Sequence, residues 1–234
     1  MQIGLVCGGR RLLFIPLMFL VLLTITDMLK GDIIRLPSVK TRGEISVEEA
    51  IYHRRSRREF EDKHLTLFHL SQILWAGQGI SSKAGFRTVP SAGATYPLVL
   101  YVAVGKVEDL ACGLYRYTPQ QHSLIPLLRE DIRQELAREA WGQTMIAKAP
   151  VDIIIAANFQ RTTSRYGSRG RRYVYMEAGH SSENIYLECE SLGLATCAVG
   201  AFNDERVKNI LRIEEEPLYI MPVGLKRGSS CGDR

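Results

Sequence analysis

Two uninterrupted apolar runs constrain the fold of this chain most strongly. They span residues 98–104 (LVLYVAV) and 151–157 (VDIIIAA), and both are rich in Val, Ile and Leu. Short runs of this composition predict strands that are buried on both faces. Helical patterns lie before, between and after them, so we expect a sheet covered by helices. Weaker strand patterns occur at residues 114–117, 122–127, 195–199 and 218–223.

Helix start and stop signals divide the rest of the chain. Ser46 and Glu49 form a capping-box pattern, which predicts a helix beginning at Val47. Thr66 can cap a second helix, and Gly193 can end a long one. The predicted helices after the first cover residues 67–76, 129–141, 173–192 and 203–211. The predicted loops are residues 79–94, rich in small residues, and residues 161–172, rich in arginine.

The N-terminus carries a separate apolar segment at residues 12–25, preceded by Arg10 and Arg11. It is shorter than the roughly 20 residues of a membrane-spanning helix. It suits a signal peptide or a short anchor. We therefore expect a membrane-anchored or exported protein, tethered through residues 12–28. A twin-arginine signal, a buried helix and a misassigned start codon are the alternatives, and without a functional segment the protein would be cytoplasmic.

Composition excludes several classes of protein. The chain has 234 residues, of which 46% are hydrophobic and 24% charged, and this rules out disordered and collagen-like chains. The expected division is a signal or anchor segment at 1–30, a linker at 31–44 and one domain at 45–228. The net charge of +5 permits nucleic acid, anionic lipid or a phosphorylated cofactor as a partner. The scattered cysteines and histidines predict no metal site.

An arginine cluster is the first candidate binding feature. Arg54, Arg55, Ser56 and Arg58 follow the first predicted helix, and Phe60 can pin the segment to the core. One guanidinium group can donate two parallel hydrogen bonds to phosphate oxygens, and a serine hydroxyl can donate a further one. A solvated charged surface is the alternative.

Three further segments could face a ligand with their backbone or their charges. The first is 90–97 (PSAGATYP), whose small residues permit close approach of a flat molecule. The second is 199–202 (VGAF), which joins a strand to a helix. The third is the pair Lys226 and Arg227 after the last strand. An ordinary turn, a plain connection and solvated cations are the corresponding alternatives.

Taken in order, these pieces resemble the nitroreductase superfamily of FMN-dependent oxidoreductases, over about residues 45–227. Arg54-Arg55-Ser56-x-Arg58-x-Phe60 is similar to the family's phosphate motif. The segment 90–97 is similar to the signature of the subgroup with the SagB-type azoline dehydrogenases, as are 113–117 (GLYRY) and 177–180 (EAGH). The resemblance implies an α+β fold with a mainly antiparallel central sheet flanked by helices, and a homodimer.

The resemblance also implies roles for individual residues. Residues of the arginine cluster would bind the FMN phosphate, helped by Lys226 or Arg227. The segment 90–93 would line the flavin across a dimer interface, and backbone amides of the 199–202 segment would face its N5 and O4. The implied cofactor-binding set is Arg54, Arg55, Ser56, Arg58, Pro90, Ser91, Ala92, Gly93, Gln143, Gly200, Ala201, Lys226 and Arg227.

The implied activity is hydride transfer from NAD(P)H through FMN to an electron-poor acceptor such as a nitro compound or a quinone. No catalytic side chain, metal or nucleic-acid partner is implied. The first alternative is a peptide azoline dehydrogenase, whose subgroup often carries a Lys-Tyr pair where this chain has Arg165-Tyr166. Arginine hardly deprotonates, so it is a poor proton shuttle. The second alternative is a flavin-binding protein without turnover.

Overall fold

A single antiparallel sheet organises the part of the chain that the computed structural model describes, residues 33–227. It has seven strands in the order β1-β4-β3-β2-β5-β7-β6, and each neighbouring pair is antiparallel. The strands are β1 (Ile34–Arg35), β2 (Leu98–Val104), β3 (Gly113–Thr118), β4 (Ser123–Leu128), β5 (Val151–Ala157), β6 (Leu194–Thr196) and β7 (Glu216–Leu225). The predicted α+β class with an antiparallel central sheet is thus confirmed.

The two apolar runs lie side by side near the middle of this sheet. Strands β2 and β5 pair along their whole length, from Leu98↔Ala157 to Val104↔Val151. Every residue of both strands is buried. Central strands covered on both faces need apolar side chains at successive positions, which is why the two runs do not alternate.

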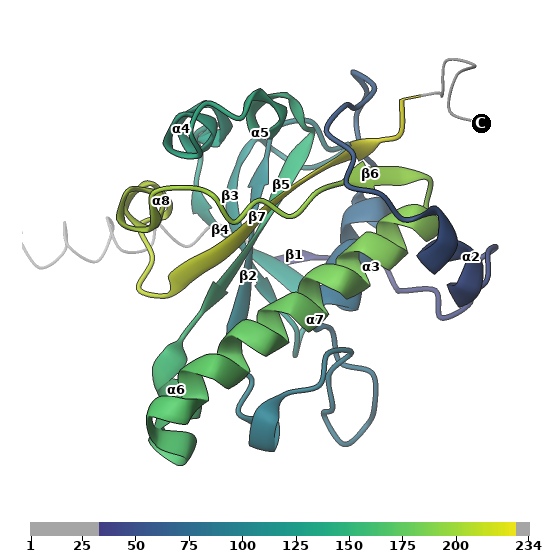
Figure 1. The fold of residues 1–234 in the computed structure, drawn as a ribbon. Coiled ribbons are helices and arrows are strands. Elements are labelled where there is room, and N and C mark those ends of the chain that lie inside the picture. Colours follow the sequence, from purple (N-terminus) through teal and green to yellow (C-terminus); the bar gives the residue numbers. More distant parts are fainter. Residues whose placement is uncertain (1–32, 228–234) are drawn as a thin grey trace, which may run out of the picture. The chain divides into compact units, whose positions relative to one another are not determined.

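Helices cover both faces of the sheet (Figure 1). One face carries the long helix α7 (Gly170–Ser191) and α3 (Leu67–Gln78), whose side chains share one hydrophobic core with β2 and β5. The other face carries the short helices α4 (Arg133–Glu139), α5 (Thr144–Lys148) and α8 (Asp204–Leu211), which form a second core. The predicted start of α2 (Val47–His53) is confirmed by a complete capping box between Ser46 and Glu49.

Two predicted elements differ from the structure. The expected loop at 161–172 is helical: α6 (Phe159–Tyr166) and a 3-10 turn lead directly into α7. Phe159 and Thr162 are buried, so packing stabilises a segment whose polar sequence lacks a helix signal. The expected helix at 129–141 is shortened to α4, and Trp141 and Gly142, which both adopt positive φ, separate it from α5.

The predicted linker also contributes to the domain. Within it, Ile34 and Arg35 form β1 and pair with β4. The backbone of Lys40 exchanges hydrogen bonds with the side chain of Gln72, at 2.7 and 3.1 Å. These contacts tie residues 34–40 to the sheet and to α3.

The expected membrane-anchored or exported location is corrected. None of the helices described between residues 33 and 227 has the length and apolar character needed to cross a bilayer. The apolar run at 12–25, on which the expectation was based, lies outside the described residues.

Candidate functional site

The arginine-containing segment docks in an extended conformation across the end of the sheet. The Arg57 amide donates to the Thr196 carbonyl at 2.9 Å, and Phe60 forms an antiparallel bridge with Lys226. The Phe60 ring covers Gly224, where an added Cβ would lie 2.7 Å from the Phe60 Cβ. Phe60 therefore holds the segment 54–60 against β6 and β7, as the sequence predicts.

One buried hydroxyl joins two parts of the predicted site. The Tyr186 hydroxyl of α7 lies 2.9 Å from Ser56 Oγ and accepts a hydrogen bond of 2.7 Å from the Ala198 amide. Because it accepts from Ala198, its own proton is available for Ser56, and Ser56 can then donate outward. The arginine segment and the strand leading to Gly200 are thus fixed to the same atom.

The arginines of the segment point in different directions. Arg54 lies over the Tyr186 ring, 5.2 Å from its centroid, and its Nε is 3.7 Å from the Glu183 carboxylate. Arg55 turns back to the end of α2 and donates to the carbonyls of Tyr52 and Arg54, so its guanidinium caps the helix. Arg58 is exposed.

The two C-terminal cations have carboxylate partners. Lys226 Nζ lies 2.5 Å from the buried Glu190, and Arg227 lies 3.2 Å from the exposed Glu59. Arg227 nevertheless lines the same pocket as Arg58. The structure thus brings Arg227 to the predicted phosphate segment and holds Lys226 beneath it.

The segment 90–97 carries unusual backbone conformations. Gly93, Ala94 and Tyr96 have φ of 59°, 53° and 45°. Left-handed φ at non-glycine residues costs energy and is common at functional sites. The Ser91 hydroxyl stabilises the turn by accepting from the Tyr96 amide at 2.9 Å. Pro90, Gly93 and Ala94 are exposed, so the backbone of this turn is accessible to a ligand.

Two residues of α6 contact this turn. Arg165 Nη1 donates to the Gly93 carbonyl at 2.9 Å. A Cβ added to Gly93 would lie 2.5 Å from the Tyr166 hydroxyl and 2.8 Å from Arg165 Nη1. The Arg165-Tyr166 pair therefore does lie at the predicted flavin-lining turn, with its arginine bound to the backbone.

Glu177 of α7 is a buried carboxyl behind the same turn. It is 2% exposed, and its Oε1 has no hydrogen-bond partner among the described residues. Burial raises its pKa to about 7, against the Ser91 hydroxyl and the Arg87 charge, which both favour the ionised form. These neighbours come from the loop before β2, a proximity that spacing along the helix does not predict.

Because the pKa of Glu177 is raised, we expect the stability of the protein to depend on pH. Between about pH 4.5 and pH 7 the folded protein retains a proton that the unfolded chain has released, so the free energy of unfolding falls as pH rises. We expect Glu177→Gln to remove ~2 kcal/mol of this decline between pH 5 and pH 8, measured by urea unfolding. The exposed Glu214→Gln is the control. If the free energy of unfolding falls equally with pH in the wild type and in Glu177→Gln, the raised pKa of Glu177 is wrong.

The segment 199–202 presents two backbone amides to solvent. Gly200 and Ala201 are exposed, and their N–H groups have no acceptor among residues 33–227. The Gln143 side chain donates to the carbonyl of Ala201 at 3.1 Å, so it supports this segment. A pocket lined by Gly200, Tyr175 and Tyr219 opens beside it.

The predicted residues thus form two groups within one chain. The Tyr186 hydroxyl contacts Ser56 of the arginine segment and the amide of Ala198, two residues before Gly200. The first group therefore offers cations for a phosphate and amides for the polar edge of a flat ring. The segment 90–93 makes no hydrogen bond to either in the described part of the chain; its partners are on α6. Tyr186 itself carries no sequence signal, because its role depends on how α7 packs against β6.

Comparison with known proteins indicates the family of this chain. The model of the Nitroreductase family matches residues 51–225. A protein of Methanocaldococcus jannaschii that carries the name of a nitroreductase, MJ1384, is 50% identical over 193 residues, covering 82% of this chain and 96% of its own. A Ralstonia eutropha JMP134 structure, also described as a nitroreductase, superposes with a TM-score of 0.75 at 29% identity, covering 85% of this chain and 91% of that one.

A more distant structure shares the fold. The Escherichia coli microcin synthetase McbBCD complex, with truncated pro-MccB17 bound, contains a chain that matches with a TM-score of 0.64 at 21% identity. The match covers 93% of this chain and 85% of that one. The family match and the more similar relatives lead to one conclusion: this chain belongs to the nitroreductase family and is an oxidoreductase enzyme.

Proposed function

We propose that the protein is an FMN-dependent oxidoreductase that takes hydride from NAD(P)H and passes it to an electron-poor acceptor such as a nitro compound or a quinone. Its FMN-binding domain would span residues 45–228. The observation that supports the proposal is the Tyr186 hydroxyl, which contacts Ser56 of the arginine segment and the Ala198 amide, two residues before the exposed Gly200. FMN needs both, because it has a phosphate at one end and a polar ring edge at the other.

The chain's own residues would bind and orient the cofactor. Arg54, Ser56 and Arg58 would hold the phosphate, with Arg227 nearby. The amides of Gly200 and Ala201 would donate to the ring edge and stabilise negative charge there. When bound, FMN would supply the hydride chemistry, which agrees with the lack of an acid–base pair among the predicted residues.

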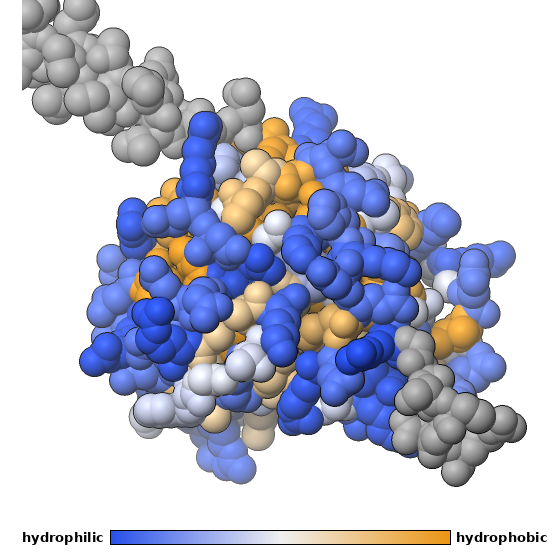
Figure 2. All heavy atoms as spheres, turned by 90° about the horizontal axis from the view of Figure 1, so that it is seen from above, coloured by the Kyte–Doolittle hydropathy of each residue, from blue (hydrophilic) through white to orange (hydrophobic). Residues whose placement is uncertain are grey.

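The exposed surface supports a homodimer. Val47, Ile51 and Tyr52 of α2 are 64%, 58% and 73% exposed, and Tyr175 and Met176 of α7 are about half exposed. In Figure 2, hydrophobic side chains reach the surface between hydrophilic ones. Exposed apolar groups on helices often mark protein interfaces. In such a dimer the exposed 90–93 turn would reach the partner's cofactor.

A peptide azoline dehydrogenase is the second candidate, because Tyr166 lies at the 90–93 turn as the subgroup's tyrosine would. The Arg165 guanidinium does not favour it, since it stays charged and donates to the Gly93 carbonyl. A flavin-binding protein without turnover is the third. An acceptor screen separates the three: quinone or nitroaromatic reduction, azoline oxidation, or neither.

The test is FMN binding followed by turnover. Reconstituted protein should show flavin absorbance, and it should oxidise more than one equivalent of NAD(P)H per flavin only when an acceptor is present. Protein that stays colourless after reconstitution would refute the proposal.

Tyr186→Phe tests the observation on which the proposal rests. It removes the hydroxyl that orients Ser56 and leaves the Ala198 amide without its acceptor, so we expect FMN to bind about 10-fold more weakly. The measurement is the quenching of FMN fluorescence on titration. Tyr115→Phe, which removes a tyrosine hydroxyl that donates to the Ala111 carbonyl, is the control and should bind FMN as the wild type does.

A further inference from the structure

A pocket of about 260 Å³ lies where strands β2 and β3 diverge. The ladder between β2 and β3 begins at Tyr101↔Arg116, whereas the ladder between β2 and β5 begins at Leu98↔Ala157. Residues 98–100 therefore have no partner on β3, although they line the pocket. Alternate backbone groups of an antiparallel strand point to each neighbour, so this edge offers unpaired backbone groups to the pocket.

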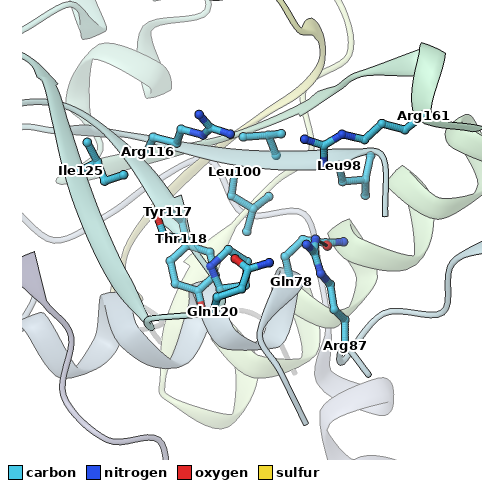
Figure 3. A pocket seen from close by; sticks show the side chains of 12 residues that line it. Gln78, Arg87, Leu98, Leu100, Arg116, Tyr117, Thr118, Gln120, Ile125 and Arg161 are labelled. Carbon is cyan, nitrogen blue, oxygen red and sulfur yellow. Dashed lines mark hydrogen bonds between the residues drawn. The ribbon is translucent and has the colours of Figure 1, made fainter. Parts of the chain in front are cut away.

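Three arginines from separate elements line this pocket. Arg87 comes from the loop after α3, Arg116 from β3 and Arg161 from α6. Figure 3 shows Arg116 and Arg161 extending toward one another from opposite sides, while Arg87 extends up beside Gln78. They lie far apart in sequence, so only the fold brings them together.

These guanidiniums make few direct contacts among the described residues. None of the three forms an ion pair there, and the Arg116 side chain makes no hydrogen bond. Arg87 donates to Gln78 Oε1 at 2.5 Å, and Arg161 donates to the Tyr96 carbonyl at 3.0 Å. Neither acceptor carries a charge.

The charges also repel one another. Burial lowers the pKa of Arg87, and the charge of Arg161 lowers it further, while Glu177 acts in the opposite direction. Glu177 itself has a pKa raised to about 7, so near neutral pH it is only partly ionised. A bound anion would relieve this repulsion and use donors that are already in place.

The size of the pocket limits the anion. Pockets for drug-sized ligands have volumes of roughly 300–1,000 Å³. At about 260 Å³ this pocket is too small for a whole dinucleotide or flavin. It suits a single oxyanion or the charged end of a small molecule.

We propose that Arg87, Arg116 and Arg161 form a binding site for a phosphate group, either as the free ion or at the end of a small molecule. The site is separate from the arginine segment 54–58. The Arg87 guanidinium lies over the Tyr96 ring, 4.6 Å from its centroid, and Arg161 donates a hydrogen bond to the Tyr96 carbonyl. The bound phosphate group would therefore also stabilise the 90–97 turn.

Calorimetric titration with inorganic phosphate, at constant ionic strength set with NaCl, tests the proposal without flavin. We expect saturable binding to the wild type, with one component weakened roughly 10-fold or more in Arg116→Gln, whose side chain makes no hydrogen bond or ion pair to the described residues. Arg161→Gln is the second variant, should the first fail to fold. Arg138→Gln, an exposed arginine of α4, should bind as the wild type does.

Two further measurements identify the ligand and locate its site. Ribose 5-phosphate that binds more tightly than inorganic phosphate would identify the end of a small molecule as the ligand; equal or weaker binding would identify the free ion. The double variant Arg54→Gln/Arg58→Gln should lose the phosphate bound at the arginine segment 54–58 and keep the binding component that Arg116→Gln weakens. Loss of all binding in that variant, with Arg116→Gln and Arg161→Gln unaffected, would overturn the proposal, as would the absence of saturable binding to the wild type.

Discussion

The double variant Arg54→Gln/Arg58→Gln should bind FMN at least about 100-fold more weakly than the wild-type protein. Each guanidinium would donate charge-assisted hydrogen bonds to the phosphate, and such a bond contributes about 1.5–3 kcal/mol. The variant should fold normally, because the Arg54–Glu183 contact is a partly exposed pair at 3.7 Å and Arg58 has no ion pair in the described part of the chain.

Fluorescence titration with FMN gives the dissociation constants, and urea unfolding checks the fold. Arg138→Gln/Arg212→Gln removes the same charge from other exposed positions and controls for long-range electrostatics. If both double variants bind FMN equally well, the cofactor phosphate lies elsewhere, and the assignment of this segment is wrong.

Gly93→Ala should cause the second large effect, at the turn predicted to line the flavin. Gly93 has φ of 59°, where a Cβ costs about 1–2 kcal/mol. The new methyl would also lie 2.5 Å from the Tyr166 hydroxyl and 2.8 Å from Arg165, so both side chains must move. We expect a loss of ~1–2 kcal/mol in stability and a roughly 10-fold or greater loss of NAD(P)H-dependent turnover.

A matched glycine separates backbone strain from displacement of these side chains. Gly85 has φ of 82°, and a Cβ there would meet no atom within 4 Å. Gly85→Ala should therefore lose similar stability and keep its turnover. Tyr166→Phe removes the hydroxyl that lies closest to the methyl group introduced by Gly93→Ala. In a double-mutant cycle, Gly93→Ala should therefore lower the free energy of unfolding less in the Tyr166→Phe background than in the wild type. Equal turnover losses in Gly85→Ala and Gly93→Ala would contradict a role for the 90–93 turn.

The local elements could largely be predicted from the chain itself. The apolar runs at 98–104 and 151–157 are strands β2 and β5, because a strand covered on both faces needs apolar residues throughout. Helix α2 begins at Val47 because its capping box is complete within four residues. Both signals are local, so they can be recognised without knowing the fold.

Elements that depend on distant packing could not be predicted. The polar segment at 161–172 has no helix signal, yet burial of Phe159 and Thr162 against the core makes it helical. Asp152 illustrates the same dependence. It sits in an apolar run whose burial raises the pKa of its carboxyl well above the usual value, although Arg133 lies near enough to lower it.

For the candidate site, the residue types came from the sequence and their grouping from the fold. The spacing of Arg54, Ser56 and Arg58, with the 90–97 segment, sufficed to indicate the family, because these motifs are contiguous. Only the packing of α7 against β6 joined Ser56 to Ala198 through Tyr186. Likewise, only the divergence of β2 from β3 brought Arg87, Arg116 and Arg161 to one pocket. Hydrogen bonds and charges act over a few ångströms in space, and residues so far apart in sequence come that close only when the sheet and its helices have assembled.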